Sequence, residues 1–516
     1  MTAAHHADVV IVGAGHNGLV AAVLLARAGL SVRVLEAADE VGGACRTERP
    51  FAKAPDLPQS TGAYLLGLMP PELMAKLDLD LPTIRRDPHY FLPTTGSRYL
   101  LFGSDDARTR EQFLRFFSAQ DFDADQALQA ELEAFRQDVG PTWLEEPLGI
   151  EETAERHVRP ALRQAFVDLC RGSVGAYLDR FGFRSDLVKA MYAVTDGFTG
   201  LHGTWDTPGT GMNFLIHNMC RLPAAGGTWM IVRGGMGTVT ARLAEAAREA
   251  GARIDTGAEV AGIEVHDGVT SGVALASGEV VRARAVVVNA DPFRMVDLVG
   301  RDAWPAPFID RIDRYRRDGT TLKVNLALDD LPRFGCLPEP QGQHNGTIHL
   351  LPDEGEVLDV VRRSYEDVRA GRLPDFPCIE WYIHTPLDPT LSDGRGRHSS
   401  ALFVQWVPYE LAGSTWDAEE AGYVKHLLSI CDRFAPGTSE RVHDVFTLTP
   451  PKIERHFGMT RGHIHHVDNS FGFADRLPYR TPIDGLYACG AGCHPGGSVI
   501  GASGHNAAMR LLRDLH

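Results

Sequence analysis

Several features that define other protein classes are missing from this 516-residue sequence. It has no run of eighteen apolar residues, so we expect no membrane-spanning helix. Basic residues number 51 against 67 acidic ones, and the net charge of −16 argues against nucleic acid as a partner. The same charge argues against a broad contact with anionic membranes but leaves room for peripheral contact through a small apolar surface. No secretory signal peptide is evident, because strand-like sequence begins at Asp8.

The sequence also has few patterns typical of disulfide bonds, metal sites or catalytic nucleophiles. The eight cysteines are dispersed without a CxxC pair, which suits a reducing cytoplasm, the location we predict. Cys489 and Cys493 lie four apart in a glycine-rich loop, where a redox disulfide is the alternative to two incidental thiols. His463, His465 and His466 have no carboxylate or cysteine at a usual ligand spacing, so no metal site is predicted. No GxSxG nucleophile motif is present.

The N-terminal region does contain a strong pattern of strand, glycine-rich turn, helix and second strand. Residues 9–12 form an apolar run of strand length, residues 19–28 are rich in Ala and Leu, and Gly29 ends this helix. Residues 31–35 form the second strand, which ends on Glu36. This order predicts a βαβ unit of the dinucleotide-binding kind.

Four residues of this unit have separate predicted roles. Gly13 permits the tight turn after the strand, Gly15 lets a pyrophosphate approach the backbone, and Gly18 lets the helix pack closely on the strand. The free N–H groups at the helix start then face the phosphates. Glu36, at the tip of the second strand, is placed to accept hydrogen bonds from a ribose.

The residues that follow resemble a known family. Glu36 with Gly42, Gly43 and Thr47 resembles the pattern of FAD-binding oxidoreductases of the amine-oxidase and phytoene-desaturase superfamily. Many members have Arg directly after the double glycine, where this chain has Ala44 and carries Arg46 two residues later. The resemblance implies FAD as the cofactor and a phosphate contact from Arg46.

The C-terminal region resembles the same family. A strand at residues 485–489 precedes the sequence GAGCHPGGSVIG and a helix at residues 503–515, and this looks like the C-terminal flavin motif of phytoene desaturases. It also resembles proteins named for a pyridine nucleotide-disulfide oxidoreductase domain. The resemblance further implies that the backbone of Val260 holds the adenine. The predicted cofactor-binding residues are Gly13, Ala14, Gly15, Asn17, Gly18, Glu36, Gly42, Gly43, Arg46, Thr47, Val260, Gly490, Gly497, Ser498 and Val499.

The order of predicted elements indicates an α/β fold with a discontinuous Rossmann-like FAD-binding domain. That domain takes residues 1–75, 226–298 and 448–516, and it includes a helix at 239–250, a β-meander over 260–283 and a buried strand at 285–290. Residues 76–225, mostly helical, and 299–447 form a substrate domain with a mixed β-sheet and helices. Its predicted strands lie at 321–327, 347–351, 379–384 and 401–407.

One window is unusually rich in soft apolar side chains. Residues 181–236 hold five of the eleven methionines together with several aromatic residues. Such side chains adapt to bulky apolar ligands, and they also fill ordinary cores. The sequence favours neither interpretation over the other.

A single nucleotide fingerprint indicates that electrons enter from an organic substrate and not from a nicotinamide. We therefore predict an FAD-dependent oxidoreductase that desaturates or dehydrogenates an apolar organic molecule, such as a polyene or lipid-like chain. Oxygen, a quinone or another acceptor would reoxidise the flavin. The alternatives are a flavin amine oxidase, a redox-neutral isomerase and a non-catalytic FAD-bound interaction protein. His466 and His494 are candidate acid–base residues, with loop ordering as the alternative role. The predicted partner is a hydrophobic small molecule, and the oligomeric state stays open.

Overall fold

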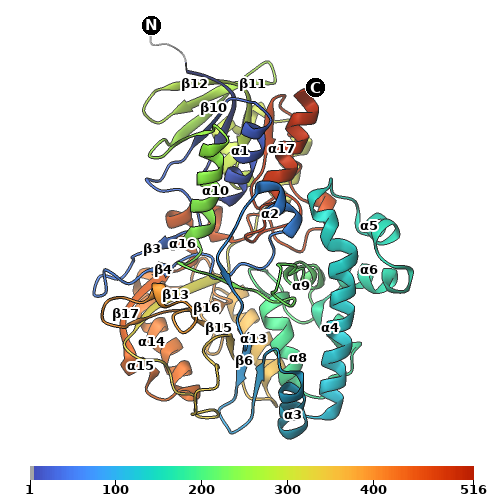
Figure 1. The fold of residues 1–516 in the computed structure, drawn as a ribbon, viewed down its shortest axis with the longest axis vertical. Helices are drawn as coiled ribbons and strands as arrows, with labels where there is room; N and C mark the ends of the chain where they lie inside the picture. The colour runs from blue at the N-terminus through green and yellow to red at the C-terminus, as the bar shows by residue number, and fades with distance from the viewer. Residues whose placement is uncertain (1–4, 516) are drawn as a thin grey trace.

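The computed structural model describes residues 5–515, which form two seven-stranded sheets and a helical region. In Figure 1 the first sheet lies at the top with both termini, the second sheet lies below it, and helices α3 to α9 form the lower right. The predicted fold class, α/β with a discontinuous Rossmann-like domain and a second domain built on a mixed sheet, is confirmed. The exact domain boundaries stay a prediction.

The first sheet brings together strands from three distant parts of the chain. Its core is parallel, with β12 and β2 on either side of β1, and Val10 pairs with Val286 and Arg33. Val9, Val10 and Ile11 are fully buried, as expected of a strand covered on both faces. The strand order is β10 (Val260–His266), β11 (Val269–Leu275), β12 (Val280–Val288), β1 (His5–Val12), β2 (Val32–Leu35) and β9 (Arg253–Asp255), and β18 (Leu486–Ala488) also pairs with β12.

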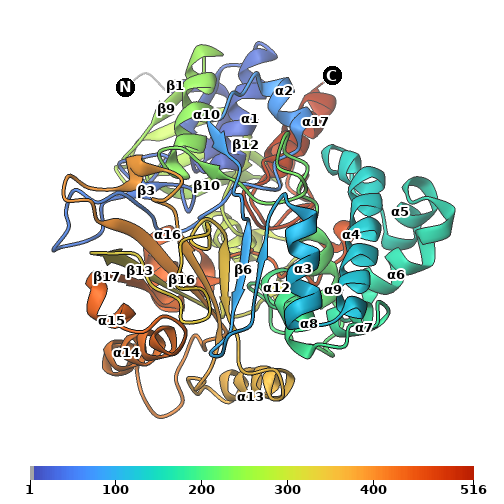
Figure 2. The ribbon, with the colours of Figure 1, turned by 60° about the horizontal axis from the view of Figure 1, so that its bottom comes forward.

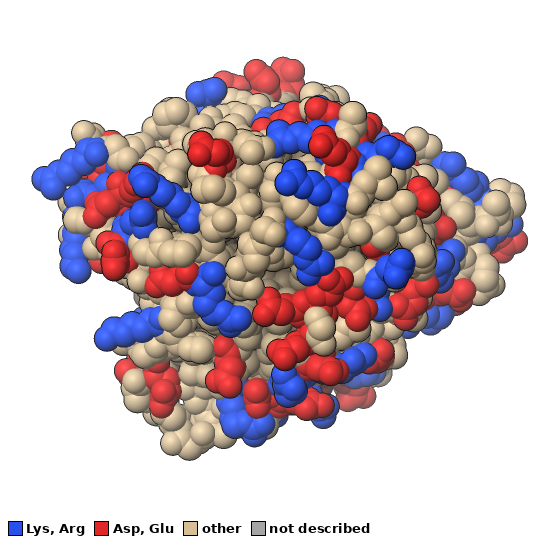
Figure 3. Space-filling view, turned by 90° about the horizontal axis from the view of Figure 1, so that it is seen from below, with Lys and Arg blue, Asp and Glu red and all other residues tan. Residues whose placement is uncertain are grey.

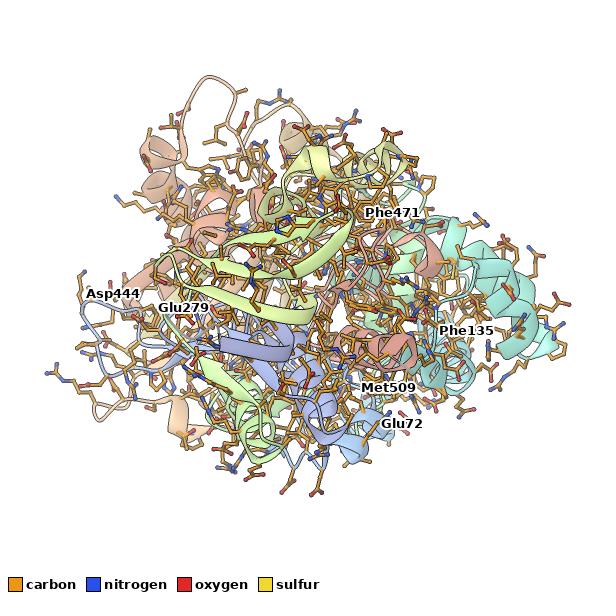
Figure 4. All side chains as sticks on the ribbon, turned by 90° about the horizontal axis from the view of Figure 1, so that it is seen from above. Glu72, Phe135, Glu279, Asp444, Phe471 and Met509 are labelled. Atoms are coloured by element: carbon orange, nitrogen blue, oxygen red, sulfur yellow. The ribbon has the colours of Figure 1, made fainter. Side chains whose placement is uncertain are left out.

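The helices α1 (His16–Arg27), α10 (Gly237–Glu249) and α17 (Ala502–Leu515) accompany this sheet, and α1 contacts the other two. Figure 4 views this end of the molecule and labels Met509 on α17 and Glu72 on α2 (Pro71–Leu77). It also labels Glu279, whose Oε1 lies 2.9 Å from Nη1 of Arg33 and links the β12 end to β2. Helix and sheet thus form one apolar core around the N-terminal βαβ unit.

One detail of the predicted meander is wrong. We expected a short strand at 280–283 and a separate buried strand at 285–290, but β12 runs unbroken from Val280 to Val288. No turn residue interrupts this stretch, so Arg284 continues the extended backbone with its side chain facing outward. The first half of β12 pairs with β11, and the second half pairs with β18.

The second sheet has one apolar face and one face that contains polar residues. On β13 (Thr321–Leu328), Leu322, Val324 and Leu326 pack with helix α14 (Trp416–Phe434), while Lys323 and Asn325 point to the opposite face. Pairing is antiparallel except between β14 and β6, so the sheet is mixed. Its remaining strands are β17 (Val442–Leu448), β16 (His398–Gln405), β15 (Cys378–Ile383), β14 (Thr347–Leu350), β6 (Tyr90–Pro93) and β7 (Tyr99–Phe102).

The helical region differs from the prediction in one respect, because the hairpin of β6 and β7 was missed. Its sequence, YFLPTTGSRYLLF, has a short apolar and aromatic run on each side of a TTGS turn, which is a readable hairpin signal. Side chains of Asp105, Ser118, Ser173 and Ser185 cap four of the helices by accepting backbone N–H groups. The helices are α3 (Asp106–Phe116), α4 (Ala119–Val139), α5 (Ile150–His157), α6 (Arg163–Arg171), α7 (Val174–Asp179), α8 (Asp186–Tyr192) and α9 (Thr210–His217).

Shorter elements join these parts, and Figure 2 shows several of them around the second sheet. They are α11 (Pro292–Val299), α12 (Ala306–Tyr315), α13 (Val357–Arg369), α15 (Thr438–Arg441), α16 (Pro450–Phe457), the strand pair β3 (Thr47–Glu48) and β4 (Gln59–Ser60), and the pair β5 (Thr83–Ile84) and β8 (Ile231–Val232).

The methionine-rich window mainly fills the core. Its methionines are at most 3% exposed, and they belong to the two largest apolar clusters: Met191, Met212, Met219, Met230 and Met236. Core packing is therefore the correct interpretation of these five side chains.

Within residues 5–515, no helix is both long enough and apolar enough to cross a bilayer. Figure 3 shows the face at the bottom of Figure 1, where acidic and basic side chains are interspersed. This view gives no sign of a broad patch of one charge on that face.

Candidate functional site: a cavity between the two sheets

A cavity of about 790 Å³ runs from the glycine-rich turn after β1 to the polar face of the second sheet. Among the predicted cofactor-binding residues, its wall includes Gly13, Gly15, Asn17, Glu36, Gly42, Gly43, Val260, Ser498 and Val499. Three distant segments of the chain therefore meet at one cavity. These residues were predicted separately from the N-terminal, middle and C-terminal motifs.

Two glycines of the fingerprint have backbone surroundings that explain their identity. Gly13 has φ +95°, a conformation that side chains disfavour, and a Cβ on Gly18 would lie 2.3 Å from the carbonyl oxygen of Gly13. Gly18 is thus required for the close approach of α1 to β1, although it lies behind the cavity wall. A Cβ on Gly15 would lie 2.9 Å from Nδ2 of Asn289, so this turn is also crowded from the β12 side.

Glu36 lies at the cavity with both carboxylate oxygens in use. Oε2 accepts from the amide of Ala14 at 2.7 Å, and Oε1 accepts from the amide of Ala38 at 3.0 Å. These bonds fix the carboxylate at the end of β2, beside the cavity wall formed by Val260. The contact of Glu36 with a ribose stays a prediction.

Arg46 and Thr47 lie away from the described cavity wall. Nη2 of Arg46 lies 3.0 Å from Nε2 of His456 and its Nε lies 3.1 Å from Glu48, so the guanidinium is turned toward α16 and β3. Oγ1 of Thr47 accepts from the amide of Gly237 at 3.0 Å and thereby joins β3 to the start of α10. The predicted phosphate contact of Arg46 therefore lacks geometric support.

Arg294 on α11 is a cation that the sequence motifs did not identify. It lines the cavity, and its side chain is 49% exposed. Because a guanidinium binds phosphate oxygens well, Arg294 is better placed for such a contact than Arg46.

The C-terminal loop closes the cavity next to His466. Gly490 and Gly497 lie behind the wall, where a Cβ would come within 2.4 Å of the Ala290 carbonyl oxygen and 2.5 Å of Cα of His465. These glycines let the loop pack against the end of β12 and the segment that carries His465. Ser498 and Val499 then reach the cavity.

The two candidate acid–base histidines have different surroundings. His466 lines the cavity, and no residue that the structure describes hydrogen-bonds to its buried Nδ1. Burial lowers its pKa, so the ring is neutral near pH 7. His494 is only 2% exposed and packs against Phe473 with 5.0 Å between ring centroids, outside the described wall. Its carbonyl oxygen accepts from Tyr479 and Ser503. Both ring nitrogens of His494 are buried without a hydrogen-bond partner among residues 5–515, and its proton-transfer role stays a prediction, as does loop ordering.

Unpaired polar atoms show that the residues present fit a large polar cofactor such as FAD. Nε2 of His16, Oδ1 of Asn17 and Nδ1 of His466 are buried at the cavity wall and have no hydrogen-bond partner among the described residues 5–515. Buried polar atoms are normally paired, so these three call for a ligand that offers hydrogen bonds. The start of α1 at His16 adds backbone donors at the same place.

The end of the cavity beyond these residues is formed by the second sheet and by loops with aromatic side chains. Tyr64, Trp229, Phe403 and Ile464 supply apolar wall, and the same part of the cavity is lined by two ionisable groups, Lys323 and Glu380. Burial lowers the pKa of Lys323 to about 7 and raises that of Glu380 to about 8. The Tyr382 hydroxyl donates to Oε2 of Glu380.

A π-helical turn at residues Ala193–Gly197 forms an adjoining part of the wall, next to the second sheet, where Oγ1 of Thr195 hydrogen-bonds to the ring of His349 on β14. It presents Thr195 and Asp196 to the cavity, and burial raises the pKa of Asp196 to about 7 although Asn218 donates to its carboxylate at 3.0 Å. Such turns occur often at functional sites because they widen a helix locally.

Sequence motifs did not identify Lys323, Glu380 or Asp196. A signal exists for the first two, because each is a charged residue at the alternate position of an otherwise apolar strand, in TLKVNLAL and CIEWYI. A charge at such a position either faces solvent or lines an internal site, and only the tertiary structure decides between them.

The described cysteines are separate buried thiols, including Cys489 and Cys493. Burial raises the pKa of both thiols, so neither is activated as a thiolate. Among residues 5–515, no cluster of three or more His, Cys, Asp or Glu side chains is arranged to hold a metal ion.

Comparison with known proteins gives a consistent result. The family described as flavin containing amine oxidoreductase matches residues 18–329. A mouse protein named pyridine nucleotide-disulfide oxidoreductase domain-containing protein 2 is 34% identical over 98% of this chain and 94% of its own length. Hydroxyneurosporene desaturase of Cereibacter sphaeroides is 27% identical over 98% of each chain.

A solved structure, that of an oxidoreductase from Methanosarcina mazei, has a TM-score of 0.61 to this chain. The two chains are 18% identical, and the match covers 98% of this chain and 99% of the other. This likeness shows that the two proteins share a fold.

Proposed function

Because the chain belongs to the flavin-containing amine oxidoreductase family and has FAD as its cofactor, we propose that it is a dehydrogenase of a mainly apolar organic molecule. The observation that carries this proposal is the single continuous cavity between the two sheets. One end has the predicted FAD-binding residues, and the other has apolar wall from residues such as Trp229 and Phe403. A relative named as a desaturase supports the same substrate class.

The chain's own residues have three tasks in this proposal. Glu36, the glycine-rich turn and the start of α1 would hold FAD, with Arg294 near its phosphates. FAD supplies a hydride acceptor when it is bound. The aromatic and aliphatic wall binds the substrate by burying its surface, at roughly 25 cal/mol per Å², and keeps water out.

Loss of a hydride and a proton leaves the substrate with a new double bond, and the proton passes to a base or to water. His466 offers a neutral ring nitrogen at the wall, Nδ1, without a partner in the described structure. Its catalytic role remains a proposal beside that of ordering the loop around Gly490. We also keep a cytoplasmic location as a proposal, supported by the dispersed unpaired cysteines.

The test is anaerobic stopped-flow reduction of the bound flavin. We expect bleaching by apolar donors and slow or absent bleaching by NADH and NADPH, since one nucleotide fingerprint is already assigned to FAD. Dithionite provides the control that the flavin is reducible. Rapid, saturable bleaching by NADPH with no response to apolar donors would contradict the proposal, and bleaching by amines alone would favour the amine oxidase alternative.

A further inference from the structure

A row of side chains crosses the cavity-facing side of the second sheet. Lys323 of β13 is directly opposite Phe403 of β16, and Phe403 is directly opposite Glu380 of β15. Residues paired in this way point to the same face, so all three side chains meet the cavity. Lys323 and Glu380 thus flank one aromatic ring, with their Cβ atoms about 10 Å apart from the strand spacing.

The side chain of Lys323 lies over the ring of Phe403, and its amino group has no hydrogen-bond acceptor among the described residues. Its Nζ lies 4.1 Å from the ring centroid of Phe403 and 4.1 Å from that of Tyr64. The residue is 6% exposed, and no described oxygen accepts a hydrogen bond from Nζ. Contacts with two rings orient the amino group but leave its N–H donors unused.

Glu380 lacks a hydrogen-bond donor for one of its oxygens, just as Lys323 lacks an acceptor. It is 3% exposed, one oxygen accepts from Tyr382, and Oε1 is buried without a partner among the described residues. Buried polar atoms rarely stay unpaired, because each one costs the free energy of its lost hydration. A donor and an acceptor on one wall of the cavity therefore both lack a partner.

The charges around this row disfavour a charged ligand. A carboxylate would accept from Lys323, but it would be repelled by Glu380 or Asp196, which also line the cavity, whenever either acid is ionised. An ammonium would pair with those carboxyls but would face Lys323, with the buried Arg86 guanidinium behind Thr347, to whose Oγ1 it donates at 2.8 Å. A neutral oxygen accepts from the lysine and also bonds to either protonation state of the glutamate.

We propose that the substrate carries a neutral oxygen group, a hydroxyl or a carbonyl, which Lys323 and Glu380 bind at the Phe403 row. This inference rests on the proposed function and adds to it, because it makes the substrate an oxygenated molecule with an otherwise apolar body. Tyr64 and Phe403 contact that body next to the oxygen, and Lys323 and Glu380 determine the specificity.

The test ranks simple probes of equal chain length on the FAD-loaded protein. Octane, 1-octanol, 2-octanone, octanoate and octylamine are titrated, and each dissociation constant is read from the shift in the flavin absorbance spectrum. We expect 1-octanol or 2-octanone to bind at least about fivefold more tightly than octane, octanoate or octylamine. A purely apolar cavity would give the opposite order for octane, which is the most hydrophobic probe.

Matched variants test whether Lys323 and Glu380 cause the preference for oxygenated probes. Lys323→Met and Glu380→Leu should each reduce the preference for the oxygenated probe over octane to less than about twofold, whereas Glu380→Gln should keep it. Lys425→Met, at an exposed lysine of α14, serves as the control and should leave the ranking unchanged. The ranking on the unaltered protein and on Glu380→Gln decides the question even if Lys323→Met fails to fold.

Tightest binding of octanoate, octylamine or octane would overturn the inference. So would an unchanged preference in folded, yellow Lys323→Met and Glu380→Leu. Failure of every donor to bleach the flavin would contradict the proposed dehydrogenation, but it would leave this ranking measurable. The two proposals therefore fail in different experiments.

Discussion

At the scale of single residues, the position of Glu36 gives a direct test of cofactor binding. Its carboxylate lies at the cavity and accepts from the amides of Ala14 and Ala38. We expect Glu36→Ala to weaken FAD binding by about 2–4 kcal/mol, because the variant loses the predicted charge-assisted hydrogen bonds between the carboxylate and the ribose of FAD. Fluorescence titration of the apoprotein with FAD measures the effect. Glu40→Ala, at an exposed position nearby, is the control, and equal affinity in a folded Glu36→Ala variant would refute the assignment.

A substitution at Gly18 tests the close packing of α1 against the turn after β1. A methyl group there would lie 2.3 Å from the carbonyl oxygen of Gly13, and neither backbone segment is free to move because both belong to the buried core. We expect Gly18→Ala to lower the free energy of unfolding by about 1–3 kcal/mol. Urea unfolding of the apoprotein measures this change. Gly422→Ala, with open space around an exposed position of α14, should be neutral or stabilising.

At the scale of elements, β13 divides its side chains between two environments. Leu326 is fully buried among the residues that pack against α14, while its neighbours Asn325 and Ala327 face the other side of the sheet. We expect Leu326→Ala to cost about 2–5 kcal/mol of stability through the cavity that it leaves. Leu114→Ala, at a leucine of α3 that is 45% exposed, should change stability by less than about 0.5 kcal/mol. Similar losses in the two variants, seen in urea unfolding, would contradict this division of faces.

At the scale of the whole molecule, buried histidines predict a loss of stability in acid. Burial lowers the pKa of six of them to about 3 or 4: His16, His89, His217, His349, His384 and His494. Between these values and the ordinary value of 6.5, the unfolded chain binds more protons, so the free energy of unfolding falls as pH decreases through that range.

Two cavity carboxyls, Asp196 and Glu380, act in the opposite direction, because their raised pKa values make the folded chain bind protons between about pH 4 and pH 7. The histidines outnumber them, so we expect the apoprotein to lose stability from pH 7 to pH 5. The loss is about 1.4 kcal/mol per pH unit for each uncompensated histidine. Urea midpoints across this range test the sign, and greater stability at pH 5 would contradict the predicted protonation states.

The sequence by itself determined the cofactor-binding half of this protein, because local spacing carries that information. Gly13 and Gly15 lie in the turn between β1 and α1, Gly18 lies in the first turn of α1, and Glu36 follows the end of the next strand. Chain connectivity alone places these residues next to one another. The family resemblance then extended the prediction to the C-terminal loop, where Ser498 and Val499 reach the same cavity.

Only the tertiary structure decided what the substrate end contains. Lys323, Phe403 and Glu380 are separated by long stretches of chain, and strand register brings them into one row. The methionine-rich window shows the converse, since composition left its role open and packing placed its methionines in the core. The alternation of apolar and polar side chains along a strand predicts that the strand has two different faces. Which face meets a cavity depends on what the rest of the chain packs against the other one.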